Sequence, residues 1–424
     1  MGRIAGRFGR VEPRRTARDF VLGLLSDVPR KTCWGLAEAA GHARPDPMQR
    51  LLREARWDAE AVRDDLRGFV TDHLGHPDGV LIPDETGDLK KGTRTVAVQR
   101  QYTGTAGRIE NAQVAVYVAY ASPRGRALID RRLYVPRSWT DDPDRCANAG
   151  IPAGVEFATK PQLALDMVGG ALDAGVAAGW VAADEVYGND PAFRAGVQER
   201  GLGYVLAVSC DHRVPIDGGK VRVRADILAA GLPAGSWQRL SAGVGSKGPR
   251  FYDWAWLDVS IPGQAGHSLL IRRNPSTGEL AYYRCWTPHP VPLAALVRVA
   301  GTRWTVEENF QAAKSQVGLD EHQVRQWICW HRFTVLAMLA LAFLAVCAAA
   351  TASTPPADPY HHTRRHQGPI ALTVAEIRRL FTTLVIQPVR DTTHRLHWSL
   401  WRRRHQAGAR RSHYRRRLAA ELAS

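Results

Sequence analysis

Two aspartates occupy positions that suit catalysis. Asp84 ends the short apolar run GVLIPD (79–84), and Asp184 ends the apolar run WVAAD (180–184). Apolar runs of this length are typical of buried strands, so both carboxylates are expected at the rim of one sheet. An aspartate at a strand end often only caps the next turn. Because two such acids share one context, the pattern favours a functional pair and a pair of caps about equally.

A glutamate provides the third acid. The segment TRWTVEENFQAAKSQVG (302–318) is predicted to be a helix. Arg303, Glu307 and Lys314 recur on one face of that helix, within about 40° of one another. Glu308 points elsewhere, so Glu307 is the better candidate. The alternative is an ordinary surface pair between Arg303 and Glu307, worth about 0.3–0.5 kcal/mol. Spacing alone leaves both interpretations open.

Three carboxylates that converge at one sheet rim would suit hard divalent cations. Mg²⁺ takes oxygen ligands and keeps several waters. Two such ions about 4 Å apart can activate a water and stabilise the leaving oxygen of a phosphodiester. Arg303 and Lys314, beside the acid, would bind the phosphates that flank the scissile one. The predicted chemistry is phosphodiester cleavage with Asp84, Asp184 and Glu307 as catalytic metal ligands, Mg²⁺ as the ion and Mn²⁺ as an expected substitute.

The net charge of +16 is concentrated at the two ends of the chain. Residues 1–31 carry a net +5 and residues 360–424 a net +11, so the body between them is neutral. Basic ends attract a polyanion, and the pattern favours nucleic acid over a merely solvated tail. The tail also interleaves aromatic rings, which could pack on sugars or bases, with arginines expected to contact DNA. The rings are Trp398, Trp401 and Tyr414, and the arginines include Arg402, Arg403, Arg404, Arg410 and Arg411.

The predicted elements change type along the chain. Helices are predicted first, at 16–25, 33–40 and 47–74. From residue 79 the pattern predicts three strands, a helix, a strand, a helix and a strand, at 79–84, 112–120, 127–135, 160–179, 180–184, 189–201 and 204–209. An antiparallel meander followed by α/β crossovers predicts a mixed sheet covered by helices. Later helices are predicted at 302–318, from about 321 to 350, and at 374–386.

This order predicts an α/β protein with several parts. Residues 1–75 are expected to form a separate helical domain that binds DNA, and residues 360–424 a basic DNA-binding region. The catalytic core is expected in two parts, 76–209 and 301–352. Between them, residues 210–300 are rich in Gly, Pro and aromatic residues with short alternating runs, which predicts a β-rich insertion.

One apolar stretch is long enough to cross a membrane. Residues 333–350 contain no charge, and a span needs about 17–25 such residues. The stretch is rich in alanine and continues a polar helix at 321–332, so a buried core helix is predicted and no membrane association is expected. The basic N-terminus is not followed by an apolar secretory segment, and the six cysteines form no C-x-x-C pair. A reducing cytoplasm is therefore the expected location.

Long segments of the sequence closely resemble the DDE transposases of bacterial insertion sequences, in the branch with a Tyr-Arg-Glu-Lys signature. The resemblance is strongest to the insertion sequence 701 family, also described as DDE superfamily endonucleases. It implies an RNase H-like core with a β-strand insertion before the third acid. The segments that carry it are 43–67, DETGDLKKGTRTVAVQRQYTGTAGRIENAQV (84–114), SWTDDPDRC (138–146), WVAADEVYGND (180–190), GYVLAV (203–208), RWTVEENFQAAKSQVGLDEHQVR (303–325) and HQAGARRSHYRRR (405–417).

The resemblance assigns roles by position. Asp84, Asp184 and Glu307 match the three acids, and Arg303 and Lys314 match the signature's Arg and Lys. Lys90 and Lys91, in the matched segment 84–114, are expected to contact DNA. The sequence departs from the family pattern at three positions, which are Pro83 and Asp88 around the first acid, and Ala300 where the signature has Tyr.

The expected partner is double-stranded DNA, both the terminal inverted repeats of an element and its target. A homodimer is expected on the DNA ends, in the cytoplasm and associated with the nucleoid. The leading hypothesis is a transposase that cuts element ends and joins them to target DNA. Two alternatives stay open, which are an RNase H-like endonuclease that cuts without joining and a DNA-binding relic that has lost catalysis.

Overall fold

Five strands that are buried on both faces form the centre of the molecule. In a computed structural model they belong to a ten-stranded mixed sheet and lie in the order β4-β3-β1-β5-β6. β3 runs antiparallel to β1 and to β4, whereas β5 and β6 run parallel to β1. This is the RNase H-like arrangement, so the predicted fold class is confirmed. The bounds are β1 (Val80–Leu89), β3 (Arg108–Ser122), β4 (Gly125–Leu133), β5 (Trp180–Ala183) and β6 (Gly203–Val208).

The structure describes residues 1–245, 248–259, 261, 263–352, 371–386 and 391–421. Within them, the β-rich insertion expected at 210–300 lengthens the central sheet. β12 (Leu280–Trp286) pairs with β6, followed outward by β11 (His267–Arg273), β10 (Gly248–Asp258) and β9 (Gln238–Gly245). The opposite edge of the sheet is β2 (Gln99–Thr103), which pairs with β3. Smaller elements complete the insertion, namely β7 (Arg213–Ile216), β8 (Val221–Arg224), α10 (Ala225–Ala230) and the short turns Asp217–Gly219 and Ala234–Ser236.

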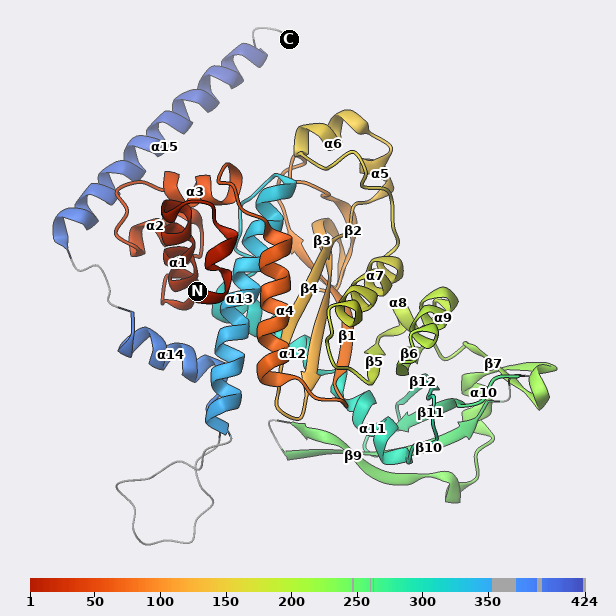
Figure 1. The fold of residues 1–424 in the computed structure, drawn as a ribbon. Helices are drawn as coiled ribbons and strands as arrows, with labels where there is room; N and C mark the ends of the chain where they lie inside the picture. The colour runs from red at the N-terminus through yellow and green to blue at the C-terminus, as the bar shows by residue number, and fades with distance from the viewer. Residues whose placement is uncertain (246–247, 260, 262, 353–370, 387–390, 422–424) are drawn as a thin grey trace, which may run out of the picture.

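Helices cover both faces of the sheet (Figure 1). One face carries α7 (Lys160–Asp173), α8 (Glu185–Gly188) and α9 (Pro191–Glu199). The other face carries α11 (Leu293–Thr302), α12 (Thr305–Val317) and α13 (Trp327–Ala352). α5 (Arg137–Thr140) and α6 (Pro143–Ala149) follow β4. The helix predicted at 302–318 is therefore shorter, because α11 ends and α12 begins on either side of Arg303 and Trp304.

The apolar helix α13 is the central support of the helical face. By length and composition it could cross a membrane, but 61% of its most apolar stretch is buried inside the protein. It packs against β4 and against α1, α3, α4, α12 and α14. Its apolar residues point in all directions because it has neighbours on most sides, which agrees with the prediction of a core helix. It begins at Trp327, not near residue 321, because residues 318–326 form an irregular connection.

The N-terminal helices share one hydrophobic core with the sheet and α13. They are η1 (Gly2–Arg7), α1 (Val11–Leu25), α2 (Cys33–Ala39), α3 (Asp46–Arg53) and α4 (Ala59–Leu74). The single helix predicted at 47–74 is wrong. It breaks where Trp57 bridges to Phe8, and Asp58 then caps α4 by accepting from the Glu60 N–H. The expected N-terminal domain is helical but has no core of its own.

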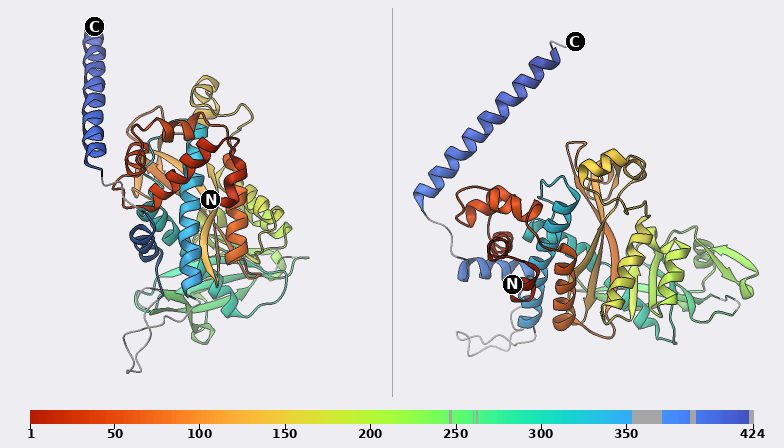
Figure 2. Two further views of the ribbon diagram at one scale, coloured as in Figure 1. Left: turned by 60° about the vertical axis from the view of Figure 1, so that its left-hand side comes forward. Right: turned by 45° about the horizontal axis from the view of Figure 1, so that its top comes forward.

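The C-terminal region begins against these helices and then leaves them. α14 (Val374–Leu384) packs on α13, and α15 (Thr392–Glu421) starts against α2. The Trp398 indole is fully buried and donates to the His42 carbonyl over 2.8 Å, and the Trp401 ring meets Trp34 edge-on at 4.8 Å. The Trp398 ring is therefore not available to pack on DNA, contrary to expectation, whereas the Trp401 ring is half-buried. Beyond them α15 projects from the body (Figures 1 and 2), whereas residues 360–370 lie outside the described residues.

A buried ionic network joins α4 to β4. Asp130 is 1% exposed and accepts from Arg63 Nη1 at 2.9 Å and from Arg67 Nη2 at 2.6 Å. Arg131, which is fully buried, pairs with Glu60 at 2.9 Å and donates to the His331 carbonyl of α13. Charges removed from water must be paired, because an isolated buried charge costs several kcal/mol. The network thus fixes how α4 and α13 sit on the central sheet.

The Asp130→Ala variant should be strongly destabilised. It leaves the partly buried guanidinium groups of Arg63 and Arg67 without their carboxylate, a change that typically costs about 3–5 kcal/mol. Denaturant unfolding followed by tryptophan fluorescence measures the effect. Glu110→Ala, which breaks the exposed pair with Arg108, is the matched control and should unfold close to the parent. Equal unfolding midpoints for Asp130→Ala and the parent would contradict the role given to the network.

Candidate active site

Asp84 lies in the middle of β1. The strand continues to Leu89 in register with β3, with Asp84 opposite Tyr117 and Pro83 opposite Val118. The prediction that the strand ends on Asp84 is therefore wrong, because β3 supports it for its whole length. What ends early is the pairing with β5, which covers only Val80 and Leu81. We call the place beyond Leu81, where this pairing has ended, the opening; Asp84 lies there and is 7% exposed.

Asp184 lies level with Asp84 across this opening. Leu81 pairs with Val181, and each aspartate stands three residues beyond its member of that pair. Residues at the same distance from a paired position on two neighbouring strands share a face of the sheet. Asp184 directly follows β5 and caps α8, where its carboxylate accepts from the Val186 N–H over 2.9 Å. Asp184 therefore caps a helix, which the sequence left open as its role, and it also lies beside Asp84.

Glu307 reaches the same place from the first turn of α12. Arg303 lies between the acids, with its Nη2 atom 3.8 Å from Asp84 Oδ2 and 3.7 Å from Glu307 Oε1. Arg303 keeps helical backbone angles although α12 begins after it, so the expected spacing along one face holds. Glu308 is turned away and pairs with Arg126 at 2.7 Å. Ala300 is 9% exposed in α11 and contributes no side chain to the opening.

The acids of this opening repel one another. Burial, and after it the charge of Asp184, raises the pKa of Asp84 to about 8, although Arg303 acts in the opposite direction. Burial and the charge of Glu85 also raise the pKa of Asp184. Glu85 was missed in the sequence, and its position directly after Asp84 was the available signal. Its carboxylate is held by Lys160 Nζ at 2.6 Å and by the Tyr187 hydroxyl at 2.7 Å.

This crowding bears on whether the acids could hold a metal ion. Among the described residues, no three acidic, histidine or cysteine side chains stand close enough to form a ready metal site. Arg303 lies between Asp84 and Glu307 and supplies the positive charge there. The donor set nevertheless fits Mg²⁺ or Mn²⁺, because it consists of carboxylate oxygens whose mutual repulsion a divalent cation would relieve. The role of the three acids as metal ligands stays a prediction.

The expected basic contacts differ in what their side chains already bind. Lys314 Nζ donates to Thr86 Oγ1 of β1 at 2.7 Å and to Thr105 Oγ1, in the turn between β2 and β3, at 3.2 Å. Lys90 is 12% exposed, with Nζ 3.4 Å from the His322 carbonyl oxygen and 3.9 Å from Asp88. Its ammonium is thus engaged within the protein, whereas Lys91 is exposed.

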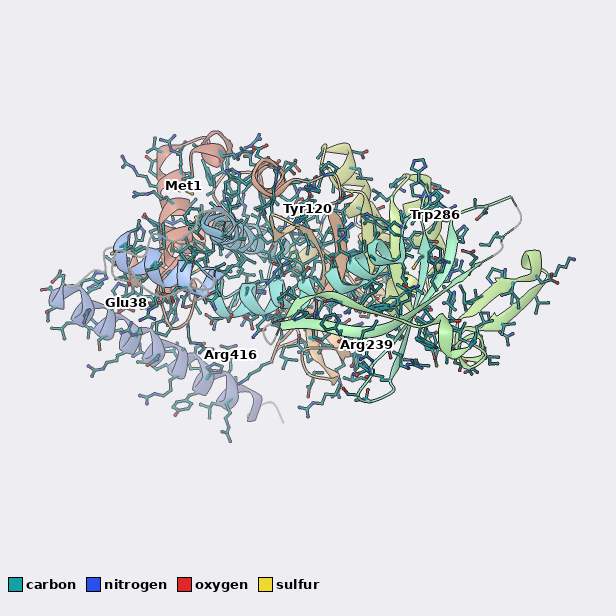
Figure 3. The ribbon with its side chains drawn as sticks, turned by 90° about the horizontal axis from the view of Figure 1, so that it is seen from below. Met1, Glu38, Tyr120, Arg239, Trp286 and Arg416 are labelled. Atoms are coloured by element: carbon teal, nitrogen blue, oxygen red, sulfur yellow. The ribbon has the colours of Figure 1, made fainter. Side chains whose placement is uncertain are left out.

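Asp88, the second departure from the family pattern, also has a structural partner, because its carboxylate lies 2.9 Å from His322 Nε2. In the tail, Arg402 pairs with Glu38 of α2 at 2.5 Å and so helps to dock α15. Arg403, Arg404, Arg410 and Arg411 are exposed on the projecting part of α15. Figure 3 shows side chains standing out from this helix around Arg416.

Comparisons with known proteins identify the family of the chain. Residues 3–225 match the model of the DDE superfamily endonuclease family, a region that contains Asp84 and Asp184. A "probable transposase for insertion sequence element IS701" from Microchaete diplosiphon is 30% identical over 198 residues, which is 46% of this chain. The chain spans about half the length of that curated relative, 49%.

Among solved structures, the piggyBac transposase in a synaptic complex with hairpin DNA is similar over 91% of this chain and 75% of its own, with a TM-score of 0.47 and 10% identity. The family match is the stronger finding, because it covers more than half of the 424 residues and both aspartates of the opening. The chain therefore belongs to the DDE superfamily endonuclease family.

Proposed function

We propose that the protein is a DDE transposase that cuts the ends of an insertion sequence and joins the freed 3′-hydroxyl to target DNA. The observation that carries the proposal is the meeting of Asp84, Asp184 and Glu307 around Arg303, from three separate parts of the chain. Asp84 lies in an RNase H-like sheet, Asp184 directly follows one of its strands, and Glu307 lies on a helix that packs against it. The chain belongs to an endonuclease family. We further infer that it acts in the cytoplasm, on nucleoid DNA, as a homodimer on the element ends.

The residues of the opening have distinct roles in this proposal. Asp84, Asp184 and Glu307 hold divalent cations, with Mg²⁺ as the expected ion. Bound there, such ions activate the attacking oxygen and stabilise the leaving oxygen of the phosphodiester. Arg303 balances the acids in the free protein and binds a DNA phosphate in the complex. Lys314, which is anchored on Thr86 two residues beyond Asp84, holds a second phosphate of the same strand.

The projecting part of α15 serves as a DNA-binding arm. Its docked beginning fixes the direction of the helix through Trp398 and the pair between Arg402 and Glu38. The exposed arginines beyond this point offer fork-shaped donors to backbone phosphates. Phosphate contacts give affinity and position but little sequence information. Recognition of the element ends is therefore expected elsewhere, and the N-terminal helices are the candidates.

Replacing any one of the three acids should abolish cleavage and leave DNA binding largely intact. Asp84→Asn, Asp184→Asn and Glu307→Gln each remove a negative donor from a unit whose members act together, so a loss of at least about 10³-fold is expected. Cleavage of end-bearing duplexes with Mg²⁺ measures the loss, and a mobility-shift assay measures binding. Glu308→Gln is the matched control and should keep most activity, because Glu308 pairs with Arg126 outside the opening.

The same assay separates the alternatives. Parental cleavage by any of the three acid variants would remove that residue from the site. Cleavage without joining to a target duplex would identify an endonuclease that lacks strand transfer. A parent that binds DNA ends and never cuts them with Mg²⁺ or Mn²⁺ would identify a binding relic.

Lys314→Ala and Arg303→Ala should weaken engagement of the scissile strand more than overall affinity. Each removes a charged phosphate contact of the kind worth about 1.5–3 kcal/mol. At protein concentrations too low to saturate the DNA, the cleavage rate should therefore fall about 10- to 100-fold. Single-turnover cleavage at varied protein concentration separates the two effects. Arg108→Ala, on the exposed β2–β3 hairpin, is the control and should behave as the parent. A uniform loss of affinity without a cleavage defect would contradict these positions.

Neutralising the exposed arginines of α15 should reduce the salt dependence of DNA binding. Each phosphate that a protein neutralises contributes about −0.9 to the slope of log affinity against log salt. If half of Arg403, Arg404, Arg410 and Arg411 touch phosphate, their joint replacement by Ala should flatten the slope by about 2. A salt titration on end-bearing and random duplexes measures this. An unchanged slope would show that α15 is a bystander.

A further inference from the structure

A second charged site lies in the insertion, away from the three acids. Arg284 of β12 is 5% exposed, and its Nε atom is buried without a hydrogen-bond partner. Within the described part of the chain, no carboxylate forms an ion pair with its guanidinium. Burying an unpaired charge is strongly unfavourable, so a guanidinium in this state calls for a counter-charge that the chain itself does not supply.

Other cationic or neutral donors surround Arg284. The sheet register places Arg284 opposite Leu206, Trp286 opposite Tyr204, and His267 opposite Trp286. Directly opposed residues, and residues two apart on one strand, share a face, so the side chains of Arg284, Tyr204 and His267 gather on the face that α8 and α9 cover. Arg194 of α9 and His212, just beyond β6, act electrostatically on the same group.

These neighbours also lack acidic partners. Arg194 donates to the Gly188 carbonyl and forms no ion pair among the described residues. His267 is 6% exposed, with Nε2 3.0 Å from Gln264 Oε1 and Nδ1 buried without a partner. Burial and the two arginines lower the pKa values of His212 and His267 to about 4, so both rings are neutral near pH 7. Asp190 acts in the opposite direction on the pKa of Arg194 and Asp211 on that of His212, and neither forms an ion pair with the cluster among the described residues.

The cluster lies on the opposite face of the sheet from the acids, because Ala183 shares the face of Arg284 and Asp184 directly follows Ala183. Leu206 of β6 pairs with Ala183 on one side and with Arg284 on the other, and Ala183 immediately precedes Asp184. Neighbouring strands are about 4.8 Å apart, which puts the backbones of Ala183 and Arg284 roughly 10 Å apart. Trp286, labelled in Figure 3, marks this end of the insertion beside the core sheet. DNA held at the acids would therefore reach the cluster only by passing over the ends of β5 and β6 to the other face of the sheet.

We propose that Arg284, Arg194, His212 and His267 form a binding pocket for a phosphate group, and that this group is a backbone phosphate of the bound DNA. Two guanidinium forks match phosphate oxygens, and neutral imidazoles add N–H donors without extra charge. The anion supplies the missing counter-charge of Arg284. The DNA origin of the phosphate rests on the proposed function, whereas the pocket itself does not.

Thermal unfolding of the full chain in sodium phosphate and in sodium chloride at equal ionic strength tests the pocket. Phosphate should raise the unfolding midpoint of the parent. Arg284→Met should unfold at a higher temperature than the parent in chloride, because it removes an unpaired buried charge, and should lose the response to phosphate. Arg273→Met on β11 is the control, because Arg273 already pairs with Asp253 at 3.3 Å, and it should keep the response.

If Arg284→Met does not fold, Arg194→Met is measured instead and should also lose the phosphate response. A parent that does not respond to phosphate, together with an Arg284→Met variant that unfolds earlier in chloride, would overturn the pocket and make Arg284 a structural residue.

The source of the phosphate is tested by a salt titration of duplex binding. Arg284→Met should flatten the slope of log affinity against log salt by about 0.9, the contribution of one phosphate. An unchanged slope with an intact phosphate response in the parent would overturn the DNA assignment and point to a free anion. Neither measurement involves cleavage, so failure of the pocket and failure of the proposed catalysis give different results.

Discussion

Charge balance around Asp84 is the constraint on which the site depends. The fold places this carboxylate inside a buried strand and brings Asp184, Glu85 and Glu307 near it, so its ionised form is disfavoured unless a cation is close. Lys160 neutralises Glu85, and Arg303 stands between Asp84 and Glu307. In the proposed function this negative charge would draw divalent cations to the position where the phosphodiester is cut.

The long-range packing of the chain produces this crowding. β3 holds β1 straight past Asp84, while β5 leaves β1 after Leu81 and so opens the sheet at the level of both aspartates. The insertion leaves the core after β6 and returns through β12 beside the same strand, and α11 then delivers α12 to the opening. α13 supports α12 from behind and is itself fixed by the N-terminal helices and by the ionic network at Asp130 and Arg131.

The sequence predicts the parts of this arrangement that depend on local pattern. Apolar runs predicted strands at β1, β5 and β6, and helical spacing separated Glu307 from Glu308, whose partner proved to be Arg126. What it could not predict depends on contacts between distant segments. β1 runs through Asp84 because β3 pairs with it, and Trp398 is buried because the turn after α2 offers the His42 carbonyl. The local sequence around Arg284 resembles that of any strand residue. Only the pairing of distant strands brings Tyr204 and His267 onto the same face.

We propose above all that Asp84, Asp184 and Glu307 bind divalent cations in place of the charge that Arg303 now supplies. Anomalous diffraction from crystals of the protein grown with Mn²⁺ tests it most directly, because the signal locates the ion without relying on activity. We expect a manganese peak in contact with the carboxylates of Asp84 and Asp184. We also expect the guanidinium of Arg303 to have moved away from Asp84. Crystals in which these carboxylates bind no manganese and Arg303 keeps its place would contradict it.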